Sequence, residues 1–391
     1  MKMPLPLICL LLLSSVSCQD YQNDRAATPK KGTVAPATQD SNPEGNVKQE
    51  PEKIPATDTA DNTDTTKQEP IVTDPMTPET GSQDTGSRNA AALKLIAYFK
   101  DISGKKTVTG QHNKEPNTDP SKWTNYIKST TGVSPGLWSG DFLFRKSDVA
   151  NRQKMIDEAI AQWKAGSIVN IMLHVCPPTQ PEDCEFNGSN SVFSKLSDAQ
   201  WADLMKDGGS LNKAWKARMD VYASFMQKLK DAGVAPMFRP FHEMNQVGFW
   251  WGGRQGSGGT AKLFEMTHDY MVKTKGLTNI VWVWDIQDLD WTWEKYKPRA
   301  DTWDVMALDV YNGDGFTTKK YTEMKAVAAG KPIAIGECEV LPTDAELAKQ
   351  PEWIFFMGWA ELVQQKNSTN NIKAIYSSSK VLNQGALKDF K

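Results

Sequence analysis

Short apolar runs alternate with amphipathic stretches from about residue 89 to the end of the chain. Residues 168–174 are apolar almost throughout, as in a parallel strand covered on both faces. Residues 215–229 instead place apolar side chains three and four positions apart, which predicts a helix with one buried stripe, and Gly233 follows as its left-handed stop. This alternation of strand and helix patterns predicts an α/β domain.

Eight segments predict strands, and helical patterns lie between several of them. The predicted strands are 106–112, 136–141, 168–174, 234–243, 279–285, 303–311, 331–337 and 353–359. The clearest predicted helices are 90–100, 149–165, 215–229 and 261–274. Eight strands with intervening helices predict a single (β/α)8 TIM barrel over residues 89–391.

The first 17 residues have the pattern of a signal peptide. Residues 5–13 form an apolar run too short to span a bilayer, and small residues then precede Cys18. This order resembles a bacterial lipobox, after which the cysteine is acylated and becomes the first residue of the mature protein. We therefore predict lipidation at Cys18, with plain signal-peptidase cleavage and secretion as the alternative.

Residues 18–88 show no apolar period and are rich in Thr, Pro, Asp, Glu, Gln and Lys. Such a segment cannot bury enough surface to offset its ordering entropy, so we predict a disordered tether. We expect an exported lipoprotein of the outer membrane, with the domain at 89–391 held at the cell surface. Exposure to the periplasm instead is the alternative.

Charge and cysteine content limit which macromolecules and metals the protein is expected to bind. The formal net charge of −2 favours neither nucleic acid nor an electrostatic membrane contact. Cys176 and Cys184 flank a turn-rich loop and are predicted to close a short disulfide, whereas a metal site is disfavoured because His174 is the only histidine nearby. We expect no metal, no cofactor, and a monomeric protein.

Polar residues stand at or just past the ends of the predicted strands. They are His112, Asp141, His174, Glu243, Asp285, Asp309, Tyr311, Glu337 and Trp359. In a barrel of this type the active site is built at the carboxyl ends of several strands at once. A single rim residue can be incidental, but nine together indicate a candidate active site at this end.

Two of these carboxylates suit the cleavage of a glycosidic bond. That reaction needs one acid that stays protonated and one carboxylate that stays ionised. Aromatic residues around Glu243 would raise its pKa. Glu337, close to Tyr311 and Arg239, would accept hydrogen bonds that keep it charged. Glu339 is the rival nucleophile, since strand alternation puts it on the same face, but it lies farther past the apolar run.

Several motifs in a fixed order resemble family 26 of the glycoside hydrolases. They are Arg239-Pro-Phe-His-Glu-Met-Asn245, Phe249-Trp-Trp-Gly252, Trp282-Val-Trp284, Leu308-Asp-Val-Tyr311 and Pro332-Ile-Ala-Ile-Gly-Glu337. The resemblance covers residues 89–391 and implies a retaining barrel enzyme, in most members an endo-β-1,4-mannanase. The leader and tether are similar to those of glycan-degrading lipoproteins of Bacteroidetes.

The resemblance also implies roles for individual residues. Glu243 is expected to be the acid/base and Glu337 the nucleophile, with Tyr311 bonded to the nucleophile and Asp309 supporting it. Substrate contacts are implied at His174, His242, Trp250, Trp251, Trp284 and Trp359. For Trp250, Trp251 and Trp284, core packing is the alternative.

Two positions depart from the family form, which has Asn-Gly after the acid and a tryptophan before Phe-Trp-Trp. This chain has Gln246 and Gly248 there. The expected function is a retaining endo-β-1,4-mannanase that hydrolyses mannan, galactomannan or glucomannan backbones by double displacement. The alternatives are another β-glycanase of the same barrel, such as an exo-mannobiohydrolase, lichenase or xylanase, and a non-catalytic surface glycan-binding lipoprotein.

Overall fold

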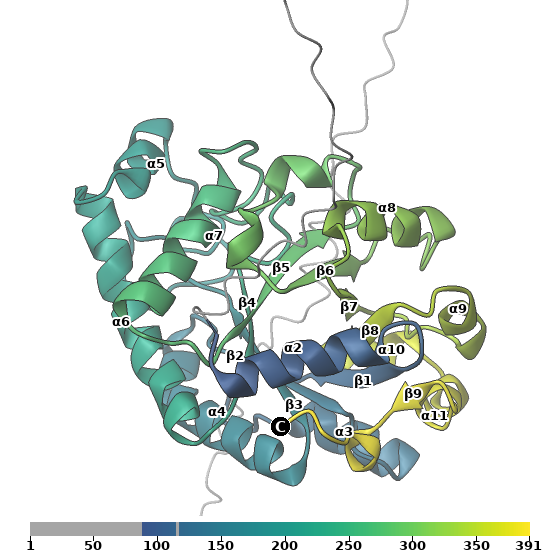
Figure 1. Cartoon of the computed structure of the whole chain (residues 1–391). Helices are drawn as coiled ribbons and strands as arrows, with labels where there is room; N and C mark the ends of the chain where they lie inside the picture. The colour runs from purple at the N-terminus through teal and green to yellow at the C-terminus, as the bar shows by residue number, and fades with distance from the viewer. Residues whose placement is uncertain (1–87, 115–116) are drawn as a thin grey trace, which may run out of the picture. The chain divides into compact units, whose positions relative to one another are not determined.

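The computed structural model describes residues 88–114 and 117–391. Eight parallel strands form a closed barrel in which each strand pairs with its neighbours in the chain and β1 pairs with both β2 and β8 (Figure 1). The strands are β1 (Thr107–His112), β2 (Leu137–Asp141), β3 (Ile168–Leu173), β4 (Met237–Pro240), β5 (Val281–Gln287), β6 (Val305–Val310), β7 (Ile333–Cys338) and β8 (Trp353–Gly358). The predicted (β/α)8 barrel is confirmed.

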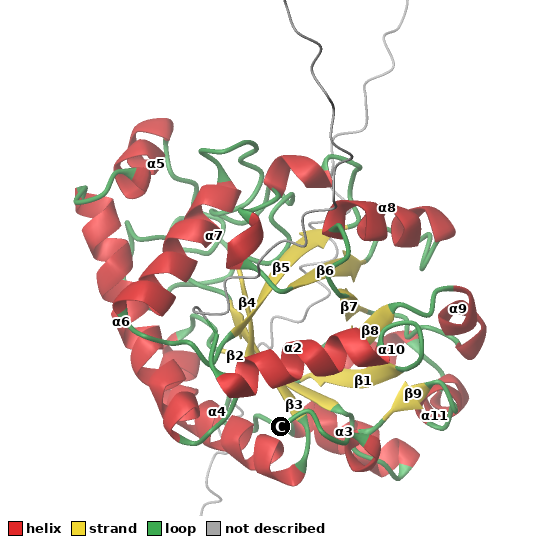
Figure 2. Ribbon diagram, viewed as in Figure 1, coloured by secondary structure: helices red, strands yellow, loops and turns green. Residues whose placement is uncertain are grey.

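Helices pack around the outside of this barrel (Figure 2). They are α2 (Ala90–Ile102), α3 (Lys122–Thr131), α4 (Lys146–Ala165), α5 (Asp198–Met205), α6 (Ser210–Asp231), α7 (Thr260–Asp269), α8 (Thr318–Ala328), α9 (Asp344–Lys349), α10 (Ala360–Lys366) and α11 (Thr369–Tyr376). The apolar stripe predicted for α6 is buried throughout, and Gly233 has a φ of 72° just after the helix ends. The short β9 (Val381–Leu382), which the apolar pattern did not predict, pairs in parallel with the first two residues of β1.

Helix α2 spans the amino ends of the barrel strands. Its cap residue Asn89 donates its backbone N–H to Thr278 O, in the loop before β5. At the other end of the helix, Gly104 donates to Pro351 O, in the loop before β8. Helix α2 therefore covers the amino end of the barrel, opposite the carboxyl ends of the strands.

Strand β4 is shorter than predicted. The expected strand 234–243 ends at Pro240, and both Phe241 and Glu243 have positive φ values, 53° and 52°. Left-handed backbone cannot continue a strand, and it is uncommon for residues other than glycine. The chain therefore turns sharply before Glu243, so that alternation along the strand does not decide where this side chain points.

The predictions for the signal peptide, for Cys18 and for the tether up to residue 87 lie outside the described residues. Within residues 88–114 and 117–391, none of the helices has the length and apolar content needed to cross a membrane.

Cys176 and Cys184 form a disulfide in the loop after β3, with a Cα–Cα distance of 6.0 Å. Arg218 of α6 ties down the same loop by donating to the carbonyl oxygens of Cys176 and Pro177, at 2.6 and 2.9 Å. The loop begins at His174, so the disulfide and the arginine together restrain one edge of the candidate site.

Replacing both disulfide cysteines with serine is expected to lower the free energy of unfolding by about 2 to 3 kcal/mol, because the short closed loop no longer restrains the unfolded chain. The Tm should then fall by roughly 3 to 5 °C. Thermal unfolding with and without a reductant provides the check. The reductant should lower the Tm of the wild type and leave the Cys176→Ser/Cys184→Ser variant unchanged; an equal shift in both proteins would contradict the role of this bond.

Candidate active site

The polar residues predicted at the strand ends meet at the carboxyl end of the barrel. His112, Asp141, Asp285, Asp309 and Glu337 lie within the last residues of β1, β2, β5, β6 and β7, whereas His174, Tyr311 and Trp359 directly follow β3, β6 and β8. Glu243 stands three residues after the end of β4. Parallel strands bring these positions to the same end because all their carboxyl ends point one way.

Three carboxylates form the centre of the site. One side-chain oxygen from each of Glu243, Asp309 and Glu337 lies within 4.8 Å of the other two, and all three residues are buried. Glycosidases that form a covalent intermediate hold their two carboxyl groups about 5 to 5.5 Å apart, whereas inverting enzymes need roughly 6.5 to 9.5 Å to admit a water. The Glu243–Glu337 spacing therefore suits nucleophilic attack by one of the two glutamates.

Arg239 of β4 provides the positive charge beneath these carboxylates. Its Nη1 donates to Asp285 Oδ2 at 2.6 Å and to Asp309 Oδ2 at 2.9 Å, and its Nη2 donates to Glu337 Oε1. One guanidinium thus bonds three acidic side chains from β5, β6 and β7. Glu243, Asp309 and Glu337 are close enough to hold a metal ion. The guanidinium of Arg239, however, already bonds Asp309 and Glu337.

Burial and the neighbouring charges shift the pKa values of Asp285, Asp309 and Arg239. Burial raises the pKa of Asp285 to about 6, although the charge of Arg239 acts in the opposite direction. Burial also raises the pKa of Asp309 well above its ordinary value, and the neighbouring carboxylates add to the effect. Burial disfavours the charged form of Arg239, but the three carboxylates outweigh it and raise the pKa of the guanidinium further.

Removing the guanidinium should destabilise the fold more at high pH than at low pH. An Arg239→Met variant leaves three buried carboxylates without their cation, which is expected to cost about 3 to 5 kcal/mol. The pKa values of Asp285 and Asp309 then rise further, so the folded state binds more protons than the unfolded state and stability falls as pH rises. Urea unfolding of both proteins at pH 5 and pH 8 measures the effect; an equal cost at both values would contradict this charge balance.

Tyr311 holds the second oxygen of Glu337. Its hydroxyl donates to Glu337 Oε2 at 2.7 Å, and its backbone N–H donates to Asp288 Oδ1 at 3.0 Å. Asp288 in turn accepts from Lys320 Nζ of α8 at 2.7 Å. Sequence patterns did not single out Asp288 or Lys320, because a loop aspartate and a helix lysine far apart in the chain show no common period.

Glu339 lies outside this cluster. Its side chain pairs with Lys366 of α10 at 3.8 Å, and its backbone oxygen accepts from Asn367 Nδ2 at 2.7 Å. Glu337 instead carries the contacts from Arg239 and Tyr311. The geometry therefore separates the two rival glutamates.

His174 is oriented by Asp141. The Nδ1 atom of His174 lies 2.5 Å from Asp141 Oδ2, and its backbone N–H donates to Asp141 Oδ1 at 3.1 Å. Burial acts to raise the pKa of Asp141, but the charge and hydrogen bond of His174 lower it below its usual value. The ring of His242 lies 4.3 Å from that of His174, so the two histidines form one wall beside Glu243.

Trp359 and His112 form a second aromatic pair, stacked with ring centroids 4.4 Å apart. Burial lowers the pKa of His112 to about 3, so this imidazole is neutral at ordinary pH. Its Nδ1 lies 2.8 Å from Ser139 Oγ of β2, which fixes the ring. A neutral ring behind Trp359 supports it without adding charge.

Two tryptophans expected to contact the substrate lie elsewhere. Trp284 packs edge-on against Trp303, on the opposite face of β5 from the inward-pointing Asp285. Trp250 packs against Trp215 of α6 and donates its indole N–H to Val175 O at 2.7 Å. Both rings are fully buried, and these contacts match the core packing that was the alternative for them.

Trp251 lies behind the histidine wall. It stacks on Phe249 with ring centroids 4.4 Å apart and donates its indole N–H to the backbone oxygen of His242 at 3.0 Å. It therefore supports the backbone next to Glu243.

The loop after β4 has no aromatic ring at its tip. The Gln246 side chain folds back to accept a hydrogen bond from the backbone N–H of Gly248, and a Cβ added to Gly248 would meet Gln246 Oε1 at 2.5 Å. Val247 between them is 73% exposed. The two departures from the family form therefore contact each other, and a larger residue at 248 would displace the Gln246 side chain from this position.

Exposed apolar side chains gather in loops at the same end of the barrel. Trp291 and Leu289 follow β5 and are 44% and 48% exposed, and Val247 and Val340 follow β4 and β7. The apolar pattern missed Trp291, because its loop has no period. Large exposed rings beside a polar site are typical of surfaces that bind sugars or other flat apolar faces.

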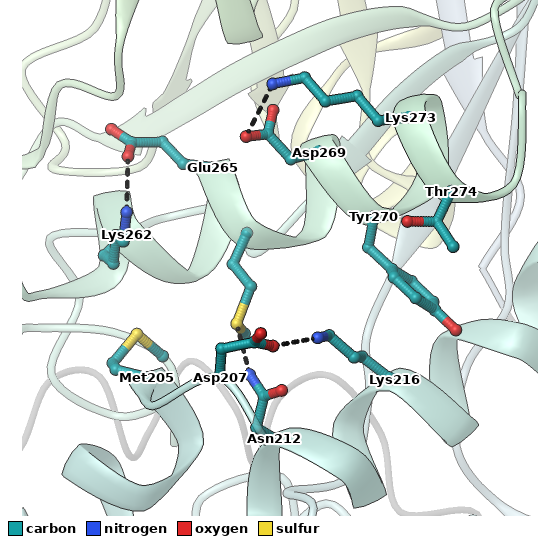
Figure 3. Close-up of a pocket in the computed structure, with 11 residues that line it drawn as sticks. Met205, Asp207, Asn212, Lys216, Lys262, Glu265, Asp269, Tyr270, Lys273 and Thr274 are labelled. Atoms are coloured by element: carbon teal, nitrogen blue, oxygen red, sulfur yellow. Dashed lines mark hydrogen bonds and ion pairs between the residues drawn. The ribbon is translucent and has the colours of Figure 1, made fainter. Parts of the chain in front are cut away.

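A separate groove of about 410 Å³ lies in the helix layer, between α6 and α7. Figure 3 shows that its charges are paired: Lys216 faces Asp207 at 2.5 Å, Lys273 faces Asp269 at 3.2 Å, and Lys262 faces Glu265 at 3.7 Å. Because its charges are matched within the groove, we assign it no catalytic role.

Comparison with known protein sequences identifies one family of glycosidases. The family model described as glycosyl hydrolase family 26 matches residues 85–386. The chain is 29% identical over 307 residues to a mannan endo-1,4-beta-mannosidase of Thermothelomyces thermophilus, and the match covers 76% of this chain and 61% of that protein. It is 26% identical to the enzyme of the same name from Bacillus subtilis, over 67% of this chain and 76% of that protein.

Solved structures agree with the sequence matches. The structure of GH26A from Muricauda sp. MAR_2010_75 superposes with a TM-score of 0.74 at 31% identity, and covers 78% of this chain and 99% of that one. A beta-mannanase from a symbiotic protist of the termite Reticulitermes speratus, complexed with gluco-manno-oligosaccharide, gives a TM-score of 0.68 at 25% identity, over 78% of this chain and 96% of that one.

Proposed function

Because this chain belongs to glycosyl hydrolase family 26, we propose that it is a retaining endo-β-1,4-mannanase with Glu337 as nucleophile and Glu243 as acid/base. The observation that carries the proposal is the side-chain oxygen spacing between Glu243 and Glu337, within 4.8 Å. Mannan is proposed as the substrate because the curated relatives named above are mannan endo-1,4-beta-mannosidases, although the chain spans only 61% of the length of the first.

In the first step, a Glu337 oxygen attacks the anomeric carbon while the glycosidic bond breaks and Glu243 gives its proton to the departing oxygen. Arg239 and Tyr311 bond the two oxygens of Glu337 and hold them in place for this attack. The products of this step are a shortened chain carrying a new hydroxyl and a glycosyl ester on Glu337. No cofactor takes part in the proposed reaction.

In the second step, Glu243 takes a proton from water as that water attacks the anomeric carbon and frees Glu337. Two inversions restore the β configuration. In this proposal His174 and His242 bind the sugar next to Glu243, and Trp359 lies under the sugar at the cleavage point. Asp309 supports the nucleophile by helping to hold Arg239.

Incubation of the purified protein with mannan, galactomannan, glucomannan, xylan and lichenan tests the activity and its substrate. We expect new reducing ends from the mannans, with a rapid fall in viscosity that marks internal cleavage. Preferred hydrolysis of xylan or lichenan would make the protein another β-glycanase, and slow viscosity loss with release of disaccharide would make it an exo-enzyme. Binding without any release would indicate a glycan-binding protein.

The stereochemical course gives an independent test of the mechanism. Proton NMR of early product from the preferred substrate should show the β anomer at the newly formed reducing end, followed by slow mutarotation. An α anomer appearing first would indicate an inverting enzyme and would contradict a covalent intermediate on Glu337.

We also propose that the protein is an exported lipoprotein, acylated at Cys18 and held at the outer cell surface by residues 18–88. The support is the apolar run at 5–13 followed by small residues and Cys18. In cells fed a labelled fatty acid, the wild type should carry the label and partition into detergent, whereas Cys18→Ala should do neither. A soluble, unlabelled wild type would indicate plain secretion. Digestion of intact cells by an added protease distinguishes surface from periplasmic exposure.

A further inference from the structure

Asp285 makes the contacts that join the two catalytic glutamates. Its Oδ1 accepts the backbone N–H of Glu243 at 2.8 Å, and its Oδ2 accepts Nη1 of Arg239 at 2.6 Å. The same arginine bonds Glu337 through Nη2. A continuous path of hydrogen bonds therefore runs from the backbone of Glu243 through Asp285 and Arg239 to Glu337.

The backbone that Asp285 holds is strained. Phe241 and Glu243 both lie in the left-handed region, which costs about 1 to 2 kcal/mol for each residue with a side chain. Such a conformation persists only when its surroundings enforce it. Two successive peptide N–H groups are bound to Asp285, because Met244 N–H also donates to the Asp285 backbone oxygen at 3.3 Å.

The next residue of the loop is bound to the same strand. Asn245 Nδ2 donates to Gln287 O at 2.7 Å, and Gln287 N–H donates to Asn245 Oδ1 at 2.8 Å. The segment from Glu243 to Asn245 is thus bound along β5 residue by residue. Among these contacts, only those of Asp285 reach both the backbone of the acid and the arginine beneath the nucleophile.

The carboxylate of Asp285 has little freedom to move. A Cβ added to Gly336 of β7 would meet Asp285 Oδ2 and Asp309 Oδ1, each at 2.5 Å. Glycine directly before Glu337 therefore leaves the space in which the two aspartates meet Arg239. Asp285 is fully buried, so no solvent competes for its two oxygens.

We propose that Asp285 is a positioning residue that holds the backbone of Glu243 so that its carboxyl group reaches the departing glycosidic oxygen. This inference rests on the proposed function, in which Glu243 is the proton donor. Asp285 itself exchanges no proton with the substrate. Without Asp285, Arg239 still bonds Asp309 and Glu337, whereas the side-chain contact to the Glu243 backbone is lost. The loss should therefore impair proton delivery to the leaving group more than attack by Glu337, and this difference can be measured.

The test compares a polysaccharide, whose leaving group needs a proton, with a dinitrophenyl β-glycoside, whose leaving group does not. The glycoside carries the disaccharide that the wild type releases. For Asp285→Asn, which keeps the shape but cannot accept two hydrogen bonds on opposite oxygens, kcat on the polysaccharide should fall about 10- to 100-fold. The dinitrophenol release rate in the first turnover should change less than about threefold, since it does not require the acid.

Asp304 offers a matched control. Its Oδ2 accepts the backbone N–H of Trp282 in β5 at 2.8 Å and Nε of Arg88 at 2.9 Å, the same kinds of partner at the amino end of the barrel. Asp304→Asn should lower the Tm but leave the ratio of the two substrate rates at the wild-type value. The amplitude of the initial burst of dinitrophenol release gives the concentration of active enzyme in each preparation.

The proposal is overturned if Asp285→Asn lowers both rates by the same factor, or lowers neither. Because both rates come from one preparation, partial unfolding cancels in their ratio. Asp285→Ser, which removes the buried charge and keeps a hydroxyl acceptor, gives a second measurement of that ratio if the asparagine variant does not fold. If the wild type cleaves no polysaccharide, the proposed function fails before any variant is compared.

Discussion

Glu337→Ala is expected to lower kcat on the preferred polysaccharide by about 10⁴-fold or more, because the covalent intermediate can no longer form. Arg239 and Tyr311 would then face an empty cavity where the carboxylate stood. Reducing-end release and the fraction of folded protein, measured on the same sample, separate loss of chemistry from loss of structure.

Azide gives a sharper test of this role. A small anion can occupy the cavity left in Glu337→Ala and attack the anomeric carbon of a dinitrophenyl β-glycoside in a single inversion, so the product should be the α-glycosyl azide. Glu339→Ala is the control, since that side chain pairs with Lys366 outside the cluster, and its activity should stay within about twofold of the wild type. Undiminished activity in Glu337→Ala would assign the nucleophile elsewhere.

Glu243→Ala is expected to lower kcat on the polysaccharide by about 10²- to 10⁴-fold, the range found when a general acid is removed. The first step on a dinitrophenyl β-glycoside should be largely spared, because that leaving group departs without a proton. The covalent intermediate should then accumulate, since no base is left to activate water. Mass spectrometry of the intact protein would show the added sugar.

Azide should give the opposite stereochemistry in this second variant. It attacks the intermediate already formed on Glu337, so two inversions yield the β-glycosyl azide. The α product in Glu337→Ala and the β product in Glu243→Ala together assign both roles. The same anomer from both variants would contradict the assignment.

The sequence predicted the barrel and the strand ends at which the candidate site residues lie. Each of the eight strands overlaps its predicted segment. The most apolar of them, such as β3, was the clearest, because a parallel strand covered on both faces is apolar along its length. Helices with a strong stripe, such as α6, were equally clear. The short β9 was not predicted, since two residues are too few to show a period.

Residue types that often bind substrates also serve in packing. Trp284 lies in a motif of the family yet faces Trp303 on the helix side of β5. Conversely, Asp288 and Lys320 escaped notice, although together they anchor the backbone of Tyr311. Residue type and spacing do not reveal which partner a side chain meets when that partner lies far away in the chain.

The sequence by itself determined the fold class and the pair of glutamates, because apolar periodicity and the strand-end position of Glu337 are local properties of the chain. Only the tertiary structure decided how the pair is held. The left-handed turn after β4 directs Glu243. Asp285 of β5 holds the backbone of Glu243, and Arg239 of β4 bonds Glu337. Barrel closure creates these contacts, since it brings together residues almost a hundred positions apart, such as Arg239 and Glu337, whose separation of 98 leaves no trace in local pattern.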